Sequence, residues 1–362
     1  MAPDELTSIV KTLWRHSFGS PGRIALDPCP ASGNNRVFVA SSENRQAIVK
    51  WYFRGGSGER DRQDCEWRFL TYAEKAGTEL APRPLGRDIG MGVTLMGYLV
   101  GKKPAPGEIG ADDVLYAADF LQRLNSREHS CSADLPEAAE ACFCTNRHFA
   151  VVRQRLARLT FEPKSDIEEQ ATKLIAEMNR FWDDLRPSIA AGLHDLAIRP
   201  DDELPISERV ISPADFGFHN AVRDPAGRVG FFDFEYGGWD DPAKTIADFF
   251  LQPAIPVPNE LQQIFLERVL GLWPQNRTLG RRTEIMMPLF ALKWCCIMLN
   301  PFSRVFASPR RFADPSMDDE ERKRLQLEKA KAAFFRLTAA GSNMRDHHGS
   351  PPAEAARPQL IR

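Results

Sequence analysis

Three oxygen-bearing side chains flank a short predicted hairpin in the second half of the sequence. The segment from Asp224 to Gly227 is typical of a tight turn, so the apolar stretches on either side of it should pair as antiparallel strands. Asp215 and Asn220 precede the first stretch, and Asp233 follows the second. Because pairing brings the two outer ends of a hairpin together, we expect these three side chains to converge at its open end.

Two carboxylates and an amide at one point are suited to binding a hard cation. Mg²⁺ takes oxygen ligands, uses one or two protein carboxylates and leaves its other positions to phosphates and water. A further aspartate that does not bind the cation could accept the proton of a hydroxyl group. The pattern therefore indicates phosphoryl transfer, although Asp and Asn taken one at a time are also common as caps and turn residues.

The same segment resembles the catalytic core of the aminoglycoside phosphotransferase/choline kinase-like family, which has the protein-kinase-like fold. The signature of that family is His-x-Asp-x-x-x-x-Asn, and Asn220 stands five positions after Asp215. Asp233 opens an Asp-Phe-Glu motif 18 positions after Asp215, and Asp241 is followed by a proline as in the family. The resemblance implies that Asp215 is the catalytic base and that Asn220 and Asp233 bind Mg²⁺.

One residue of the signature is absent. The histidine of the signature would fall at position 213, where this chain has a proline. In related kinases that histidine is mainly structural, so we expect Pro213 to be compatible with activity. His219 stands next to Asn220 but outside the signature position, and we interpret it as a structural residue.

The resemblance also requires a lysine for the nucleotide phosphates and a glutamate that holds it. Lys50 ends an Ala-Ile-Val-Lys stretch that resembles the Val-Ala-Ile-Lys strand of kinases. It lies between apolar residues, so burial is plausible and a carboxylate partner would be needed. Glu66 on the following helix fits the Glu-x-x-x-Leu pattern of the family, with Asp64 and Glu59 as alternatives.

Two further segments of the amino-terminal part have counterparts in the family. The stretch 31–36 lies between predicted strands, so Ser32, Gly33 and Asn34 could offer backbone N–H groups to phosphate oxygens. It contains one glycine only, and an ordinary hairpin turn is the alternative interpretation. The stretch 94–101 resembles the hinge between kinase lobes, which implies that backbone groups around Met96 and Tyr98 bind the adenine of ATP.

The hinge-like stretch departs from the family at one position. The family has an acidic residue where this chain has Gly97. Recognition of adenine through backbone groups does not depend on that side chain.

Hydrophobic periodicity predicts the elements that must position these residues. Alternation and turn signals predict strands at 36–40, 46–53 and 92–99 and a β-rich segment at 208–236. Helical spacing predicts helices at 5–17, 61–75, 112–124, 259–273, 279–299 and 318–339. A capping box at Ser165 and Glu168 begins another helix, which we expect to end at Pro187.

This order of elements predicts an α+β fold with two lobes. Residues 1–100 would form a small β-rich nucleotide-binding lobe, with the hinge at about 96–101. Residues 101–340 would form a larger, mostly helical lobe that carries the catalytic residues and binds the acceptor. The segment 341–362 is rich in Pro, Ala, Gly and charge without an apolar period, so we expect a disordered tail.

Composition limits the partners of the protein. The 362 residues include 47 basic and 49 acidic side chains, so no overall field would attract nucleic acid or an anionic membrane. We see no run of about 20 apolar residues for a membrane span and no secretory signal. The seven cysteines fit no zinc-binding pattern, which favours reduced, buried thiols and a cytoplasmic location.

The prediction is an ATP- and Mg²⁺-dependent kinase whose acceptor is a hydroxyl group of a small molecule. A sugar, an aminoglycoside and an amino alcohol all remain open as acceptors, and the sequence leaves the oligomeric state open too. Acidic or aromatic candidates for contacts with the acceptor are Trp182, Asp183, Asp184, Glu235, Asp240 and Asp241. The alternative is a nucleotide-binding pseudokinase that acts as a scaffold. A protein kinase is disfavoured because no Ala-Pro-Glu motif follows Asp233.

Overall fold

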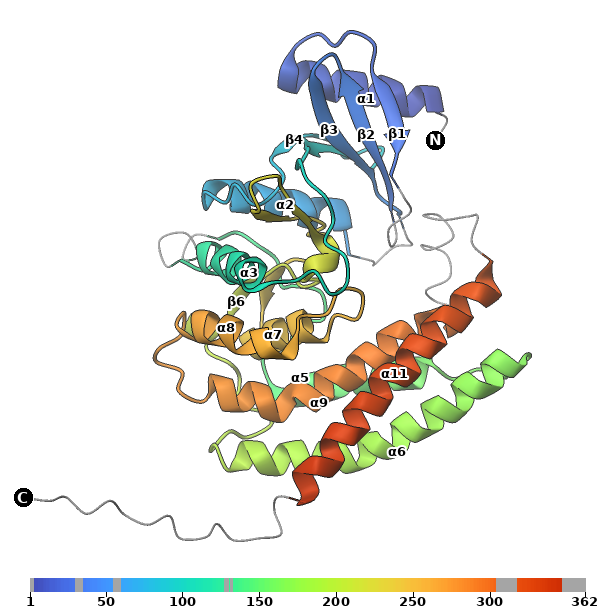
Figure 1. The fold of residues 1–362 in the computed structure, drawn as a ribbon, viewed down its shortest axis with the longest axis vertical. Coiled ribbons are helices and arrows are strands. Elements are labelled where there is room, and N and C mark those ends of the chain that lie inside the picture. Colours follow the sequence, from blue (N-terminus) through green and yellow to red (C-terminus); the bar gives the residue numbers. More distant parts are fainter. Residues whose placement is uncertain are drawn as a thin grey trace, which may run out of the picture.

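The computed structural model describes residues 3–29, 35–54, 60–126, 130, 133–303 and 318–346 (Figure 1). A helix, α1 (Pro3–Phe18), precedes a five-stranded antiparallel sheet of order β1-β2-β3-β5-β4, so β3 lies at its centre. The strands are β1 (Ala25–Pro28), β2 (Arg36–Ser42), β3 (Arg45–Trp51), β4 (Pro84–Asp88) and β5 (Val93–Gly97), and helix α2 (Arg62–Lys75) connects β3 to β4.

Helix α1 covers one face of this sheet (Figure 1). Its residues Leu6, Val10 and Trp14 recur at helical spacing and are buried against Val49 of β3 and Leu95 of β5. Sequence patterns gave bounds for β2, β3 and β5 but none for β1 or β4. Strand β1 is largely exposed, and β4 begins with a proline and contains a register shift, so neither strand shows regular alternation.

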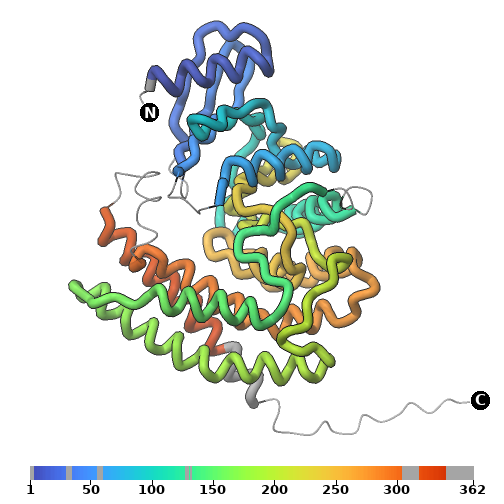
Figure 2. Tube along the Cα trace, turned by 180° about the vertical axis from the view of Figure 1, so that it is seen from behind, coloured from blue at the N-terminus to red at the C-terminus, as the bar shows by residue number. Residues whose placement is uncertain are grey.

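The larger part of the structure is helical (Figures 1 and 2). Its helices are α3 (Ala111–Leu124), α5 (Thr145–Arg158), α6 (Asp166–His194), α7 (Pro242–Leu251), α8 (Asn259–Leu270), α9 (Leu279–Met298) and α11 (Asp319–Asp346). Helix α9 contacts α5, α6, α7 and α11, so it forms the centre of this part. A single large hydrophobic core joins these helices to α2.

The predicted hairpin lies between the sheet and the helices. Strands β7 (Ala221–Arg223) and β8 (Val229–Phe231) pair antiparallel, with Ala221 opposite Phe231. The short strands β6 (Val210–Ser212) and β9 (Gly238–Asp240) pair beside them. The segment after β5 is joined to the hairpin, because the backbone groups of Lys102 and Arg223 exchange hydrogen bonds of 2.8 and 2.9 Å. This contact fixes the hairpin against the segment that connects the two parts of the chain.

Two helix ends differ from the predictions. Helix α6 continues through Pro187 to His194, although proline removes one backbone hydrogen bond. Beyond the proline, Ile189 and Leu193 are buried in the large core, so packing sustains a helix that the local sequence interrupts. Helix α11 extends to Asp346, past the expected end at residue 339, and residues 347–362 lie outside the described part of the chain.

The described cysteines are free thiols. Five of them are buried, and Cys29 is half-buried. Burial raises the pKa of the Cys142 and Cys295 thiols to about 12, which leaves them protonated and unreactive at neutral pH.

Candidate functional site

Lys50 lies on the central strand β3 and faces away from α1. The buried Ala47 and Val49 face the core beneath α1, so the alternating residues Ile48 and Lys50 lie on the opposite face of the sheet. Only 5% of the surface of Lys50 is exposed. A buried ammonium group needs carboxylate partners to compensate for the water that it has lost.

Three carboxylates surround the Lys50 ammonium. Its Nζ lies 2.6 Å from Oε2 of Glu66 on α2 and 3.3 Å from Oε2 of Glu235, and it also forms an ion pair with Asp233. Burial alone lowers the pKa of the Lys50 ammonium, but the three carboxylates outweigh burial and raise that pKa well above its usual value. Lys50 is therefore protonated at neutral pH.

Glu66 is fixed by several donors. The Tyr52 hydroxyl donates to Oε2 at 2.6 Å, and the backbone N–H of Phe234 donates to Oε1 at 3.0 Å. Burial raises the pKa of the Glu66 carboxyl; Lys50 opposes this rise but does not cancel it. Of the two alternatives to Glu66, Asp64 bonds Arg87 at 2.9 Å instead, and Glu59 lies outside the described residues.

Glu235 belongs to this site, although the sequence suggested it only as a contact for the acceptor. It is 2% exposed, and besides Lys50 it accepts a hydrogen bond from the Asn35 amide. The guanidinium of Arg62, at the start of α2, lies 4.0 Å from Oε1 of Glu235. The signal that could have identified Glu235 is its place two residues after Asp233, in a motif already assigned to the site.

The carboxylates of Glu66, Asp233 and Glu235 could hold a divalent cation. One oxygen of each lies within 4.8 Å of the others, and Asp233 keeps 30% of its side chain exposed. The Lys50 ammonium and the more distant Arg62 guanidinium together cannot neutralise three carboxylates, so the cluster retains negative charge that attracts a cation. Oxygen donors with excess negative charge are the ligand set that Mg²⁺ prefers, and these residues therefore fit that ion.

A strained turn positions Asp215. The backbone N–H of Asp215 donates to the carbonyl of Pro213 at 2.9 Å, which closes a three-residue turn around Ala214. Ala214 has a φ of 66°, in the left-handed region that non-glycine residues rarely adopt, and its N–H donates to the Ser212 hydroxyl at 3.0 Å. Strain of this kind persists where the surrounding structure holds it, and here it precedes the residue predicted to be the base.

Asn220 links Asp215 to the hairpin. Its amide donates to the backbone carbonyl of Asp215 at 3.1 Å and lies 3.5 Å from Oδ2 of the same residue. The backbone carbonyl of Asn220 accepts a hydrogen bond of 2.9 Å from the N–H of Phe232, the residue before Asp233. The backbone thus brings Asp215, Asn220 and Asp233 to the open end of the hairpin. His219 also reaches Asp215, with Nε2 3.2 Å from Oδ1.

The predicted adenine-binding residues lie at the end of β5. Met96 is buried opposite Ile48 of β3, and Tyr98 follows the last residue of the strand and is half-buried. The N–H of Gly97 donates to the carbonyl of Arg83 at 2.8 Å, and a Cβ at position 97 would lie 3.2 Å from the Arg83 backbone nitrogen. Close approach of this second segment explains a glycine where the family has an acidic residue.

The predicted phosphate loop is only partly within the described chain. Ser32, Gly33 and Asn34 lie outside the described residues. The next residue, Asn35, accepts the N–H of Phe53 at 3.1 Å and donates to Glu235. The end of the loop is therefore attached both to β3 and to the carboxylate cluster.

Two of the acidic candidates for the acceptor are engaged elsewhere. Asp240 is fully buried in an ion pair with Lys244, and Asp241 is fully buried in a bidentate ion pair with Arg282. Trp182 packs inside the core edge-to-face with Phe149. Asp183 and Asp184 are exposed on α6. Within the described part of the chain, none of these five residues forms a hydrogen bond or an ion pair with Asp215.

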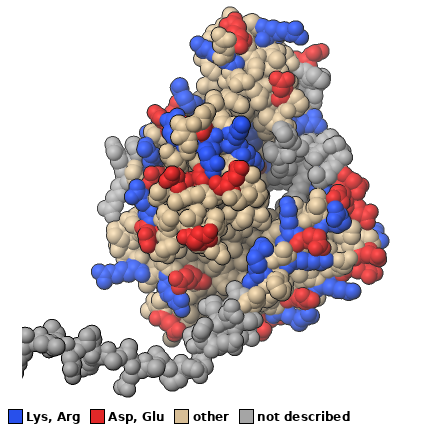
Figure 3. Space-filling model, in the orientation of Figure 1, with Lys and Arg blue, Asp and Glu red and all other residues tan. Residues whose placement is uncertain are grey.

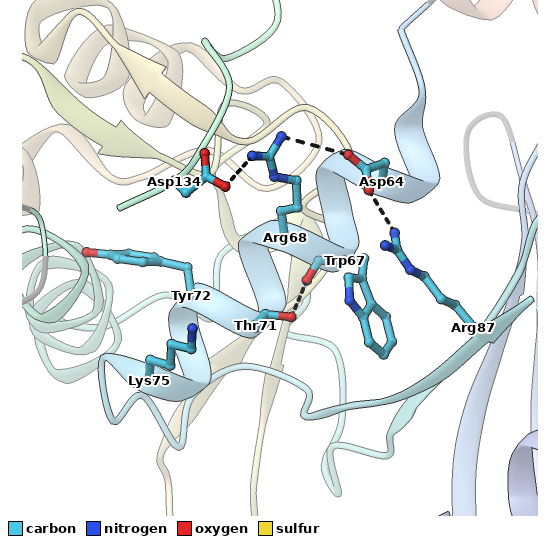
Figure 4. A pocket seen from close by; sticks show the side chains of 8 residues that line it. All are labelled: Asp64, Trp67, Arg68, Thr71, Tyr72, Lys75, Arg87 and Asp134. Atoms are coloured by element: carbon cyan, nitrogen blue, oxygen red, sulfur yellow. Dashed lines mark hydrogen bonds and ion pairs between the residues drawn. The ribbon is translucent and has the colours of Figure 1, made fainter. Parts of the chain in front are cut away.

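A pocket of about 450 Å³ lies along α2, and Glu66 is not among the residues that line it (Figure 4). Figure 4 shows Trp67 beside Arg87, and Arg68 reaching both Asp64 and Asp134. Both acidic groups of the lining, Asp64 and Asp134, are already paired with Arg68 or Arg87, so the pocket holds no group of converging carboxylates that could bind a cation. The carboxylate cluster around Lys50 is the better candidate site.

The surface carries both signs of charge. On the face shown in Figure 3, basic side chains gather at mid-height directly above a row of acidic ones, as expected for a chain with a net charge of −2. Within the described part of the chain, no helix combines the length and the apolar character needed to cross a bilayer.

The chain resembles known proteins in sequence and in fold. A sequence model described as the phosphotransferase enzyme family matches residues 27–276. Among curated proteins, none matches the chain. Similar solved structures include a choline/ethanolamine kinase family protein from Mesorhizobium loti, with 18% identity, a TM-score of 0.56 and coverage of 92% of this chain and 98% of that chain.

Two further structures have the same fold. The choline kinase from Cryptosporidium parvum is 14% identical, with a TM-score of 0.55 and coverage of 91% and 97% of the two chains. The ADP-bound aminoglycoside phosphotransferase APH(2'')-Ib is 16% identical, with a TM-score of 0.56 and coverage of 92% and 99%. At these identities the likeness shows the fold.

Proposed function

Because the chain belongs to the phosphotransferase enzyme family, we propose that it transfers the γ-phosphoryl group of ATP to a hydroxyl group of a small molecule, with Mg²⁺ as the required cation. The family and the two-lobed protein-kinase-like fold predicted from the sequence are confirmed. We keep residues 1–100 as the nucleotide-binding lobe and 101–340 as the lobe that binds the acceptor. ATP use and the free thiols of the described chain support a cytoplasmic location.

The observation that carries the proposal is the convergence on Lys50 of Glu66, Asp233 and Glu235. Lys50 is held protonated where it can contact phosphate oxygens, and Glu66 fixes its position. Asp233, Glu235 and Asn220 would hold Mg²⁺, which when bound would neutralise phosphate charge during transfer. Backbone groups near Met96 and Tyr98 would bind the adenine, and the N–H groups of Ser32, Gly33 and Asn34 the phosphates.

Asp215 acts as the general base in this proposal. Its carboxylate is 36% exposed, so a substrate hydroxyl can approach it. The hydroxyl proton passes to Asp215 as the hydroxyl oxygen forms a bond to the γ-phosphorus. The bond from that phosphorus to the bridging oxygen breaks, and ADP leaves with the electron pair. Positioning and charge neutralisation supply most of the rate, and a positioned base adds about 10²- to 10⁴-fold.

For the acceptor we propose only a broad class, a small molecule with a free hydroxyl group. The solved structures with this fold include choline kinases and aminoglycoside phosphotransferases. Unpaired carboxylates at Asp240 and Asp241 would favour a cationic acceptor. However, Asp240 is paired with the buried Lys244, and Asp241 is paired with the buried Arg282. We therefore keep amino alcohols, aminoglycosides and sugars as equal candidates.

The test is ADP release from Mg·ATP in the presence of pooled sugars, aminoglycosides or amino alcohols. We expect one pool to stimulate turnover, and Asp215→Asn to reduce that turnover at least about 10²-fold while ADP binding stays the same. The exposed Asp112→Asn on α3 serves as the matched control and should behave as wild type. Unchanged turnover in Asp215→Asn would refute its role as the base.

A pseudokinase that acts as a scaffold remains the second candidate, and the proline at position 213 is the observation that favours it. Hydrolysis of Mg·ATP without an acceptor separates the two functions. Slow hydrolysis that disappears in Asp233→Ala supports the kinase. Nucleotide binding without hydrolysis, in the presence of every acceptor pool, supports the scaffold.

A further inference from the structure

Among the residues that the structure describes, His219 is the only histidine that contacts Asp215. It belongs to the short 3₁₀ turn Phe218–Asn220, and its Nε2 lies 3.2 Å from Oδ1 of Asp215. Its side chain is 15% exposed, against 36% for Asp215. The histidine thus lies behind the carboxylate and leaves the exposed part of the aspartate to the substrate.

We propose that His219 is a positioning residue, which holds the Asp215 carboxylate in the orientation that accepts the substrate proton. This inference rests on the proposed function, because Asp215 is the base only if the protein is a phosphotransferase. Position 213, where the family signature has its histidine, is a proline here. The chain therefore supplies an imidazole to its catalytic loop from the other side of Asp215.

The two oxygens of Asp215 have different surroundings. Oδ1 faces Nε2 of His219, whereas Oδ2 has the Asn220 amide at 3.5 Å, the limit of a hydrogen bond. A carboxylate fixed through one oxygen keeps the other available for a hydroxyl group. The assignment needs only a neutral ring that donates from Nε2, with no uptake of a proton by the histidine.

The second ring nitrogen shows that packing alone does not explain this residue. When Nε2 donates to a carboxylate, Nδ1 of the neutral ring is an acceptor. Nδ1 is buried and has no hydrogen-bond partner among the described residues. A buried acceptor without a donor destabilises the fold. If the ring did no more than fill space in the core, an apolar side chain would therefore give a more stable protein.

Gly217 makes room for the ring. A Cβ at position 217 would lie 3.0 Å from Nδ1 of His219 and 3.2 Å from Cγ of Gln252. The φ of Gly217 is 167°, extended backbone that any residue can adopt, so the reason for glycine here is space. An alanine at 217 would therefore displace the imidazole without a direct contact to Asp215.

The first experiment measures ADP release from Mg·ATP with water as the acceptor. Phenylalanine in His219→Phe keeps a ring of similar shape but cannot donate, and we expect a fall in kcat of about 10- to 100-fold with an unchanged KM for ATP. Glutamine in His219→Gln places an amide donor near the position of Nε2 and should restore at least part of kcat. A structural role predicts the opposite order, with phenylalanine tolerated and glutamine disruptive.

Gly217→Ala provides a second route to the same displacement. We expect its kcat to fall in the same direction, and the double variant with His219→Phe to show no further loss, because both changes remove one interaction. Thermal unfolding of every variant separates loss of function from loss of fold. Wild-type kcat in a folded His219→Phe would overturn the proposal.

A measurement that does not depend on turnover tests the role of His219 separately from the proposed function. In a long-range ¹H–¹⁵N spectrum, the His219 ring should be the Nε2–H tautomer, with an Nε2–H proton that exchanges slowly with water because it is bonded to Asp215. Asp215→Ala should make that proton exchange rapidly, and an exchange rate that does not respond to Asp215→Ala overturns this inference. A wild-type protein that never hydrolyses Mg·ATP counts against the proposed function instead, and the spectrum then still decides whether His219 holds Asp215.

Discussion

The ring of Phe234 stacks on the ring of Phe69, with centroids 4.7 Å apart. Phe69 lies one helical turn after Glu66 on α2, and Phe234 directly follows Asp233. The backbone N–H of Phe234 also donates to Glu66. Phe234 thus joins α2, whose Glu66 pairs with Lys50, to the loop that carries Asp233, and both Phe69 and Phe234 belong to the large core.

Truncation of this aromatic pair should loosen the site. Phe234→Ala removes a side chain that is 1% exposed, and we expect it to lower the free energy of unfolding by about 3–5 kcal/mol. Urea denaturation measures the loss. The matched control is Phe335→Ala on α11, where the ring is 73% exposed and the change should stay within about 0.5 kcal/mol. Equal losses in both variants would contradict the role of the stack.

Lys50 should stabilise the fold as well as bind nucleotide. Lys50→Met leaves the carboxylates of Glu66, Asp233 and Glu235 without their ammonium, which we expect to cost about 3–5 kcal/mol in EDTA. Saturating Mg²⁺ should recover part of that loss, because a divalent cation can replace the missing positive charge. Unfolding curves with and without Mg²⁺ test this, and an equal loss in both conditions would argue against a cation site here.

Glu235 should contribute to cation binding. Glu235→Gln keeps the shape of the side chain and an acceptor for Asn35 but removes one negative charge. We expect a smaller rise in Tm on addition of Mg²⁺ and a higher Mg²⁺ concentration for half-maximal turnover. Glu137→Gln is the control, since that side chain is exposed. Identical Mg²⁺ responses in the two variants would exclude Glu235 from the site.

Asp241 should make the stability of the protein depend on acidic pH. Burial alone raises the pKa of the Asp241 carboxyl, but Arg282 and His148 outweigh burial and lower that pKa well below its usual value. A carboxylate with a lowered pKa stabilises the fold above the pKa of the unfolded chain, about 3.9, and this contribution is lost as the pH falls below that value.

The variant Asp241→Asn tests this dependence. At pH 7 it breaks a buried ion pair with Arg282, and we expect a loss of about 3–5 kcal/mol. The difference from wild type should shrink as the pH falls below about 4, because only the wild type then loses the contribution of the carboxylate. Urea unfolding at several pH values measures it. A difference that stays constant down to acidic pH would contradict the assigned ion pair.

Sequence patterns by themselves determined the parts of the site that lie on single elements. The turn at 224–227 and its apolar flanks predicted the hairpin, because a tight turn fixes which residues pair. The spacing of Asp215, Asn220 and Asp233 identified the family, and the resemblance of residues 47–50 to the Val-Ala-Ile-Lys strand of kinases singled out Lys50. These inferences depend only on short stretches of chain, whose conformation is governed by local sterics and periodicity.

Tertiary structure alone decided which side chains meet. Glu235 joins Lys50, and His219 reaches Asp215, because loops and strands that are separate in the sequence pack together. Asp241 is not available to an acceptor because it pairs with Arg282 of α9, 41 positions away in the sequence. Helix α6 passes through Pro187 because burial of the residues beyond it outweighs one lost hydrogen bond. The sum of long-range burial and charge pairing in the folded chain decides such contacts, and no local pattern records it.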